Sequence, residues 1–476
     1  MVTLQSSFSD SFNKPTKRQK TSSDDQDGFI SAHHPNNVQP LGNSFADPLG
    51  QTRRRLGAGQ LGCLSDDILV DVMKCLSPRD LCRLSNVSPF LYILTNHDDL
   101  WKTVTLRDRE SLPRFHVNWK QTYLTISGVD VLLKPLQFAS IYSDFLFQPW
   151  LNSTKEIPPR WLSRSTIDRR SANDLTVEAF IEEYEKPRIP VIITDLVNCW
   201  PAFGKWTPEY LSDIFQDIPV NVQVVDMTLN AFWSYANQTK DETPLYLFEK
   251  EFVNKMPSLE SDFQVPKYFR DDLFQLLSAA RPDFRWIVAG PGRSGSTFHQ
   301  DPNATSAWNA VLTGSKKWIL FPKHICPPGV IPSEDGAEVM TPLSLIEWFS
   351  SYYSEAEKLN PYEGIVEAGE LMFIPSGMWH CVLNLDSSIA VTQNFVSSQN
   401  LLDVLNFAKK SPDLVSGYKG DVSLADMLRD LVNKHYPSLI ADLEKQQLNE
   451  PQSVWSVCTQ DVDGSEKFCF GFASED

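Results

Sequence analysis

The sequence lacks a long hydrophobic run. No apolar stretch among its 476 residues approaches the roughly 18 residues that a membrane-spanning helix needs. The polar N-terminus also lacks the apolar segment of a secretory signal peptide. We therefore expect a soluble, intracellular protein that has no membrane partner.

Basic charge is also scarce. The chain has 43 Lys and Arg residues against 60 Asp and Glu residues, which gives a net charge of −17. A charge of this sign repels phosphate backbones unless a local basic patch intervenes. The composition therefore disfavours direct nucleic-acid binding.

Paired cysteines are absent as well. The eight cysteines show neither a CxxC pair nor the regular spacing of a zinc ribbon. This usage is typical of reduced thiols in the nucleus or cytoplasm. The cysteines are Cys63, Cys75, Cys82, Cys199, Cys326, Cys381, Cys458 and Cys469.

Large apolar residues are abundant, and the chain is longer than one hydrophobic core usually serves. We expect two or three folded units with tails. Residues 1–58 are polar and are expected to be disordered. Two basic clusters in this tail, Lys14 to Lys20 and Arg53 to Arg55, are either nuclear-import signals or solvated charge. They predict a nuclear protein that can also occur in the cytoplasm.

Residues 59–106 have apolar residues at helical spacing and predict about three short helices. Ser65 is a good helix start, and the segment from Ser77 to Asp80 interrupts one helix and starts the next. This stretch resembles an F-box, although Ser65 stands where that family usually has proline. The resemblance implies an apolar helical face that docks on the Skp-type adaptor of a cullin ubiquitin ligase. A purely structural helical hairpin is the alternative. The matching residues are Leu64, Ile68, Leu69, Leu81, Cys82, Leu84, Val87, Leu100 and Trp101.

The rest of the chain divides into three segments. Residues 107–165 read as a connector with short strand-like pieces, packed on both neighbours. Residues 166–400 contain evenly spaced short strands, which predict a mainly β jelly-roll or cupin barrel, a double-stranded β-helix, with flanking α-helices. Residues 401–476 return to helical periodicity and are expected to cap the barrel or form a homodimer. The expected strands include "RWIVAG", "TSAWNAVL", "KKWILFP", "GELMFIP" and "IAVTQNF".

The stretch "TFHQDP" predicts a metal site. On a strand, residues i and i+2 point to the same face, so His299 and Asp301 project together. A second histidine would complete the two-histidine, one-carboxylate triad that leaves open positions on Fe(II). His380, which starts another expected strand, is the best third ligand, because the remaining histidines lack strand-paired carboxylates or lie outside the β domain.

Three further residues are expected to line the same interior. Asn309 lies on the strand after His299 and Asp301, and a hairpin turn at Gly314 brings Lys316 onto the next strand. Lysine supplies a fixed cation for a dicarboxylate co-substrate. A second hairpin, which turns at residues 386–388, places the Thr392 hydroxyl on the strand opposing that of His380.

This ordered set resembles the jumonji-C family of 2-oxoglutarate oxygenases, from about Thr166 to Ser397. The motifs "TPLYLFEKEF", "RWIVAGPGRSGSTFHQDPNATSAWNAVLTGSKKW" and "MWHCVLNLDSSIAVTQNF" look closest to its branch of bifunctional arginine demethylases and lysyl hydroxylases. The resemblance implies Fe(II), 2-oxoglutarate and O2, with Lys316 on the distal carboxylate of the co-substrate. The implied iron ligands are His299, Asp301 and His380, and the implied co-substrate supports are Tyr246, Asn309, Thr392 and Ser296, the last at a position where the family often has threonine.

The expected activity is hydroxylation of lysine or demethylation of methylarginine in a protein substrate, of which a histone is one candidate. The triad does not distinguish the two outcomes. An alternative is a ubiquitin-ligase substrate receptor whose barrel only binds targets. A structural zinc site is disfavoured, because closed zinc sites prefer four ligands. The GxGxxG pattern from Gly290 to Gly295 precedes an expected strand, whereas a dinucleotide site needs a helix there.

Overall fold

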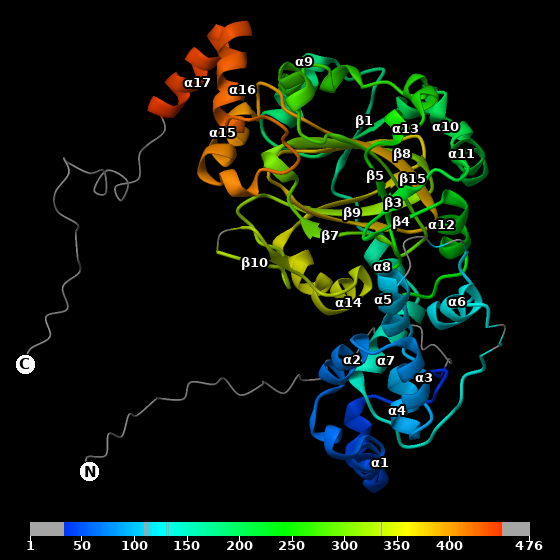
Figure 1. Ribbon diagram of the computed structural model, residues 1–476. Helices are drawn as coiled ribbons and strands as arrows, with labels where there is room; N and C mark the ends of the chain where they lie inside the picture. The colour runs from blue at the N-terminus through cyan, green and yellow to red at the C-terminus, as the bar shows by residue number, and fades with distance from the viewer. Residues whose placement is uncertain are drawn as a thin grey trace, which may run out of the picture.

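In the computed structural model, the described residues are 33–108, 112, 114–129, 131, 133–334 and 336–449. They form an N-terminal helical module, two facing β-sheets and a C-terminal group of helices (Figure 1). No helix among them combines the length and apolar character that crossing a membrane requires.

The N-terminal module is helical, as the spacing of apolar residues predicts. Serines cap two of its helices: the side chain of Ser77 accepts a hydrogen bond from Asp80 N, and that of Ser88 from Leu91 N. Proline occupies the first turn after each cap. The helices are α2 (Asp66–Lys74), α3 (Pro78–Leu84), α4 (Pro89–Thr95) and α5 (Asp98–Asp108).

The prediction of disorder up to residue 58 is wrong for its last part, and residues 1–32 lie outside the described residues. Two elements, η1 (Leu41–Ala46) and α1 (Pro48–Ala58), precede the F-box-like helices. The distant segment around residue 141 orders them: Gln39 N donates to Ile141 O over 3.0 Å and Leu41 N to the Asp144 carboxylate over 2.7 Å. Local composition does not reveal such partners.

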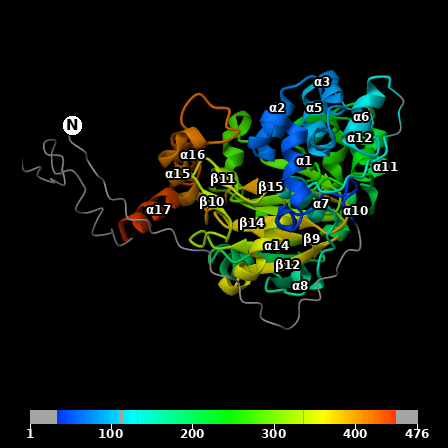
Figure 2. The same ribbon diagram turned by 90° about the horizontal axis from the view of Figure 1, so that it is seen from below.

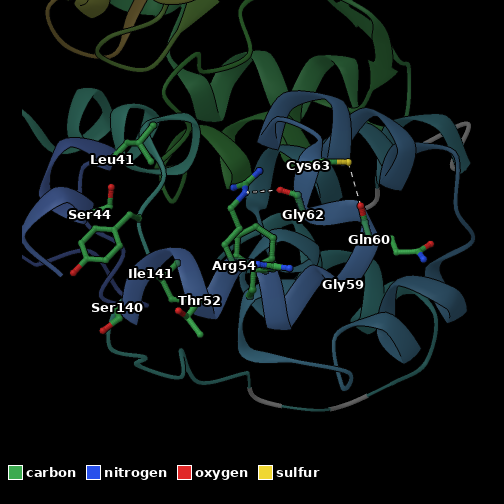
Figure 3. A pocket seen from close by; sticks show the side chains of 13 residues that line it. Leu41, Ser44, Thr52, Arg54, Gly59, Gln60, Gly62, Cys63, Ser140 and Ile141 are labelled. Carbon is green, nitrogen blue, oxygen red and sulfur yellow. Dashed lines mark hydrogen bonds between the residues drawn. The ribbon is translucent and has the colours of Figure 1, made fainter. Parts of the chain in front are cut away.

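A cavity of about 640 Å³ is lined by this N-terminal segment, by Phe90 of α4 and by residues 140–142, and by no residue of the β-sheets (Figure 3). Arg54 lines it, and its guanidinium is already bound to Gly62 O, Leu64 O and the Asp66 carboxylate. The Arg54 guanidinium is therefore engaged by the protein itself.

The connector is helical, which corrects the expectation of strand-like pieces. It contacts both neighbours, as expected: Trp119 Nε1 donates to the Asp241 carboxylate over 3.0 Å, and Ser143 Oγ donates to Asp66 over 2.5 Å. Its helices are α6 (Trp119–Ile126), α7 (Asp144–Thr154) and α8 (Pro159–Leu162).

The β domain has two main sheets whose inner faces share one apolar core, and two small two-stranded sheets, β3–β4 (Val220–Val222 and Val225–Met227) and β10–β11 (Ile331–Pro332 and Val339–Met340). One sheet has the order β1-β2-β13-β8-β15-β6-β5, with only β1 and β2 parallel, and the other has the order β12-β9-β14-β7. The shared core includes Met372 and Val311 from the first sheet and Trp318 and Val382 from the second. This is the expected cupin-like fold. The strands are β1 (Asp168–Ser171), β2 (Val191–Thr194), β5 (Leu247–Glu249), β6 (Arg285–Gly290), β7 (Gly295–His299), β8 (Ser306–Thr313), β9 (Ser315–Phe321), β12 (Tyr362–Glu367), β13 (Leu371–Ile374), β14 (Trp379–Asn384) and β15 (Ser388–Phe395).

Two predicted hairpins are instead crossings between the sheets. Strands β8 and β9, joined at Gly314, belong to different sheets, and so do β14 and β15. The two crossings pack together, because Ser315 N donates to the Asp386 carboxylate over 2.7 Å. The GxGxxG pattern runs from the last residue of β6, Gly290, to the first residue of β7, Gly295, so a strand and not a helix follows it.

Helices cover both outer faces and one end of the sheets. The helix α14 (Leu345–Ala356) packs on the outer face of the smaller sheet, where Trp348 and Phe349 meet Ile319 and Phe321. The C-terminal helices α15 (Leu401–Lys410), α16 (Leu424–His435) and α17 (Pro437–Asn449) share a core with η7 (Leu273–Ala280). Figures 1 and 2 show these three helices at one side of the sheets, away from α10 and α11 (Ala202–Lys205 and Pro208–Phe215).

Candidate metal centre

Three of the residues expected to bind metal meet at one end of the smaller sheet. Strand β7 pairs with β14 so that His299 lies opposite His380, and the two ring centroids are 4.2 Å apart. Asp301 lies two residues beyond His299, the last residue of β7, and so just past the strand on which the sequence had placed it. One ligand atom from each of the three residues lies within 4.8 Å of the others. The described structure therefore brings together the set that strand alternation predicted.

Backbone carbonyls fix the tautomer of both histidines. His299 Nδ1 lies 2.7 Å from Thr297 O, and His380 Nδ1 lies 3.0 Å from Met378 O. A carbonyl oxygen only accepts, so each Nδ1 carries the hydrogen and each Nε2 keeps a free lone pair. Metal-binding histidines are commonly oriented in this way.

The carboxylate also suits a cation. Burial raises the pKa of Asp301 to about 6, while His299 and a hydrogen bond from Asn394 act in the opposite direction. Burial and the nearby His299 hold the pKa of His380 well below its ordinary value. Asp301 Oδ2 is buried and has no hydrogen-bond partner. A buried, unpaired carboxylate oxygen beside two imidazoles matches the ligand preference of Fe(II).

Lys316 forms a second polar centre inside the sheets. Its side chain is fully buried, and Nζ donates to Tyr246 OH over 3.1 Å, to Asn384 Oδ1 over 2.7 Å and to Ser388 Oγ over 3.0 Å. None of these partners is a carboxylate, and burial lowers the pKa of Lys316 to about 7. A buried cation held only by neutral groups fits the carboxylate of a ligand.

The two centres share strand β14. His380 and Asn384 lie four residues apart, which is about 13 Å along a strand, and alternate residues point inward. On strand β8 of the facing sheet, Asn309 Oδ1 is buried without a hydrogen-bond partner. The interior therefore offers metal-ligand atoms and a buried cation on the smaller sheet and an unsatisfied amide on the larger one.

Comparisons with known proteins match this arrangement. A family model described as a cupin-like domain covers residues 177–400, and an F-box-like model covers residues 66–107. The chain is 43% identical over 417 residues to the arginine-specific demethylase JMJ22 of Arabidopsis thaliana, which spans 86% of this chain and 83% of the relative. It is 37% identical over 310 residues to the bifunctional arginine demethylase and lysyl-hydroxylase psr-1 of Caenorhabditis elegans, which spans 62% of this chain and 74% of the relative.

The chain belongs to the jumonji-C family of oxygenases. A further relative, 30% identical over 262 residues, is the human 2-oxoglutarate and iron-dependent oxygenase JMJD4, and the match spans 48% of this chain and 61% of that protein. The chain is thus a 2-oxoglutarate-dependent dioxygenase whose cofactor is Fe(II).

The remaining predicted site residues of this jumonji-C oxygenase differ in whether their polar groups already have partners within the protein. Tyr246, which the resemblance implied as a co-substrate support, is buried and its hydroxyl accepts a hydrogen bond from Lys316. Thr392 lies beside Asn309 in the ladder, but its hydroxyl donates to Trp308 O over 2.9 Å, so its hydrogen is engaged by the backbone. Ser296 lies on β7 opposite Val382 and next to neither polar centre in the ladder.

The sequence did not identify Asn384 and Ser388 as site residues. Asn384 has the same strand face as His380, and this alternation was the signal that could have found it. Ser388 gave no such signal, because it seemed only to close a turn. Cys381 points to the opposite face, into the core under α14, and so does not complete a zinc site.

Proposed function

We propose that this oxygenase removes methyl groups from methylarginine side chains of protein substrates, with lysyl hydroxylation as the second candidate. The meeting of His299, Asp301 and His380 beside the buried Lys316 supports an intact catalytic site. The names of JMJ22 and psr-1 support the choice of arginine. A receptor that only binds targets needs neither an unpaired buried carboxylate nor a buried lysine without a counter-ion.

The proposed roles follow from the contacts. His299 and His380, each held by a carbonyl at Nδ1, and Asp301 would hold the iron, which together with 2-oxoglutarate and O2 supplies oxidation of a C–H bond. Lys316 Nζ would bind the distal carboxylate of 2-oxoglutarate, which would replace a neutral hydrogen-bond partner such as Asn384 Oδ1. Hydroxylation of an N-methyl carbon gives a carbinolamine that loses formaldehyde, whereas a hydroxylated lysine carbon is stable.

The test uses the purified full-length chain with Fe(II), 2-oxoglutarate and ascorbate. Peptides that carry dimethylarginine, unmodified arginine or lysine are compared by succinate release and mass. We expect succinate and formaldehyde in equal amounts with the methylated peptide, and none with His299→Ala. A gain of one oxygen on the lysine peptide would instead establish the second candidate. Binding of neither Fe(II) nor 2-oxoglutarate would refute both.

The remaining proposals concern partners and location. The exposed residues Ile68 and Val72 of α2 support docking of a Skp-type adaptor. The basic cluster from Lys14 to Lys20, outside the described residues, supports a nuclear location and a nuclear target such as a histone. Exclusion of a tagged chain from the nucleus would contradict this location. A homodimer through the C-terminal helices stays a prediction, for which sedimentation at micromolar concentration is the measurement.

A further inference from the structure

The turn that carries Asp301 has an unusual backbone. Asn303 and Ala304 both adopt left-handed conformations, with φ of 56° and 53°. Asparagine tolerates this region better than most residues, whereas alanine does not favour it. Asn303 is nevertheless only 3% exposed, so its side chain points into the protein and not to solvent.

Both ends of the Asn303 amide are used by one residue of the C-terminal region. Nδ2 donates to Ser416 O, and Oδ1 accepts from Ser416 N, each over 2.9 Å. The two residues are 113 positions apart in the sequence. This reciprocal pair is the polar contact between the Asp301 turn and the segment that links α15 to α16.

The Ser416 segment is itself fixed to the body of the domain. Lys419 N donates to Ala280 O over 3.3 Å, and a Cβ at Gly417 would lie 3.0 Å from Asp283 N, which shows how closely the two backbones approach. Helices α15 and α16 share an apolar core with η7. The Asn303 amide therefore binds to a rigid element.

Other contacts hold the flanks of the same turn. Gln300 Nε2 donates to Gly377 O over 2.7 Å, and Ser376 Oγ donates to Ala304 O over 2.7 Å. These contacts come from the β13–β14 connection, which precedes His380. The Asn303–Ser416 hydrogen bonds add a contact from the C-terminal helical region to this turn. Asn303 lies two residues after Asp301, whose carboxylate faces both histidines.

We infer that Asn303 is a positioning residue for the metal centre, through which the C-terminal helical region holds the Asp301 carboxylate toward His299 and His380. The inference rests on the proposed role of Asp301 as a metal ligand, and on no particular protein substrate. The C-terminal helices thus complete the metal site in addition to capping the sheets.

The decisive variant is Asn303→Gly in the full-length chain. Glycine adopts a φ of 56° without strain, so this change removes the two hydrogen bonds and keeps the backbone conformation. We titrate metal-free protein with Co(II) alone and record its visible absorption, which reports ligand geometry. Loss of partners that orient metal ligands typically weakens binding about 10- to 100-fold, and we expect this range together with a changed spectrum.

Two matched controls separate positioning from general destabilisation. Asn360→Gly makes the same change at another left-handed asparagine, with φ of 50°, at the exposed end of η9 (Glu357–Leu359). Ser416→Ala keeps both hydrogen bonds, because they use only backbone atoms of Ser416. Both variants should bind Co(II) with the affinity and spectrum of the wild type.

A variant at Ser416, the partner of Asn303, tests the inference if Asn303→Gly does not fold. Ser416→Pro removes the N–H that Asn303 accepts, and Val415 before it already has the extended backbone that proline requires, with φ of −66° and ψ of 118°. We expect a weaker loss of affinity, since one hydrogen bond remains. Unchanged Co(II) affinity and spectrum in whichever of these variants folds would overturn the inference. If the wild type binds Co(II) no better than Asp301→Ala, the proposed metal site itself is wrong.

Discussion

Lys316 makes co-substrate binding depend on pH. Its pKa is lowered to about 7 by burial, so the charged fraction in the free protein falls as pH rises through 7. A dicarboxylate binds the charged form. We expect the apparent affinity for 2-oxoglutarate to fall with a limiting slope of about tenfold per pH unit between pH 7 and 9. The measurement is a 2-oxoglutarate titration of Mn(II)-loaded protein at several pH values from 7 to 9.

Lys316→Met is the matched control for this dependence. It keeps a long unbranched side chain and removes the charge, so it should bind Mn(II) normally, bind 2-oxoglutarate weakly and show no slope. An affinity of the wild type that is constant from pH 7 to 9 would mean that Lys316 is not the partner of the distal carboxylate.

Strand alternation was sufficient to predict that His299 and His380 meet, because the local pattern determines the inward faces of their strands. Asp301 also meets them, although it lies two residues past the end of β7. Thr392 was placed inside for the same reason, but its bond to Trp308 O depends on the ladder between β15 and β8. Asn303 lacked any local signal, because its partner Ser416 belongs to another segment.

At the scale of the element, the sequence predicted the strands better than their partners. The stretch around Gly314 has the composition of a hairpin turn, yet it joins strands of facing sheets. A hairpin turn and a connection between facing sheets have the same residue composition. What differs here is that the connection at Gly314 packs against the β14–β15 connection through the hydrogen bond from Ser315 to Asp386. The order of η1 and α1 likewise depends on contacts around Ile141 and Asp144 that lie about 100 residues away.

Pairing of β7 with β14 gives an element-scale prediction. Gly295 has φ of 144°, and a Cβ there would lie 1.9 Å from Val382 O. Gly295→Ala must therefore displace β7 from β14, which carries His380. We expect the free energy of unfolding to fall by at least about 1–3 kcal/mol, together with weaker Co(II) binding. Chemical denaturation and Co(II) titration measure the two effects.

Gly42→Ala serves as the control, because nothing lies within 4 Å of a Cβ at that position and its φ is not positive. It should change neither quantity. If Gly295→Ala lowers stability but leaves Co(II) affinity unchanged, the β7–β14 register does not set the ligand geometry.

At the scale of the whole molecule, the helical module is joined to the catalytic domain by a compact interface. Lys102 Nζ lies 3.0 Å from the Asp241 carboxylate, and Trp119 donates to the same group. Phe115 packs edge-on against Tyr235, with ring centroids 5.1 Å apart. The sequence distinguished the two units by periodicity and predicted a connector packed on both, but it did not indicate which residues meet. The modules are therefore one packed body.

The adaptor proposal can be tested separately from catalysis because α2 has two distinct faces. Leu69 and Met73 are 2% exposed and form the core of the module, whereas Ile68 and Val72 are 47% and 51% exposed. The double variant Ile68→Asp, Val72→Asp should weaken binding of a purified Skp-type adaptor at least about tenfold, since charge is costly in an apolar interface. Succinate production should stay at the level of the wild type.

Val224→Asp is the matched control for this variant, since Val224 is 81% exposed on the catalytic domain and away from α2. It should alter neither adaptor binding nor turnover. Undiminished adaptor binding by the double variant would show that the adaptor uses another surface or that the helices are only structural. Loss of both binding and turnover would mean that the substitutions unfold α2 and, through the interface of Lys102 and Trp119 with Asp241, disturb the catalytic domain. Loss of binding alone would show that one packed body carries two independent surfaces, one for the adaptor and one for the oxidation of its target.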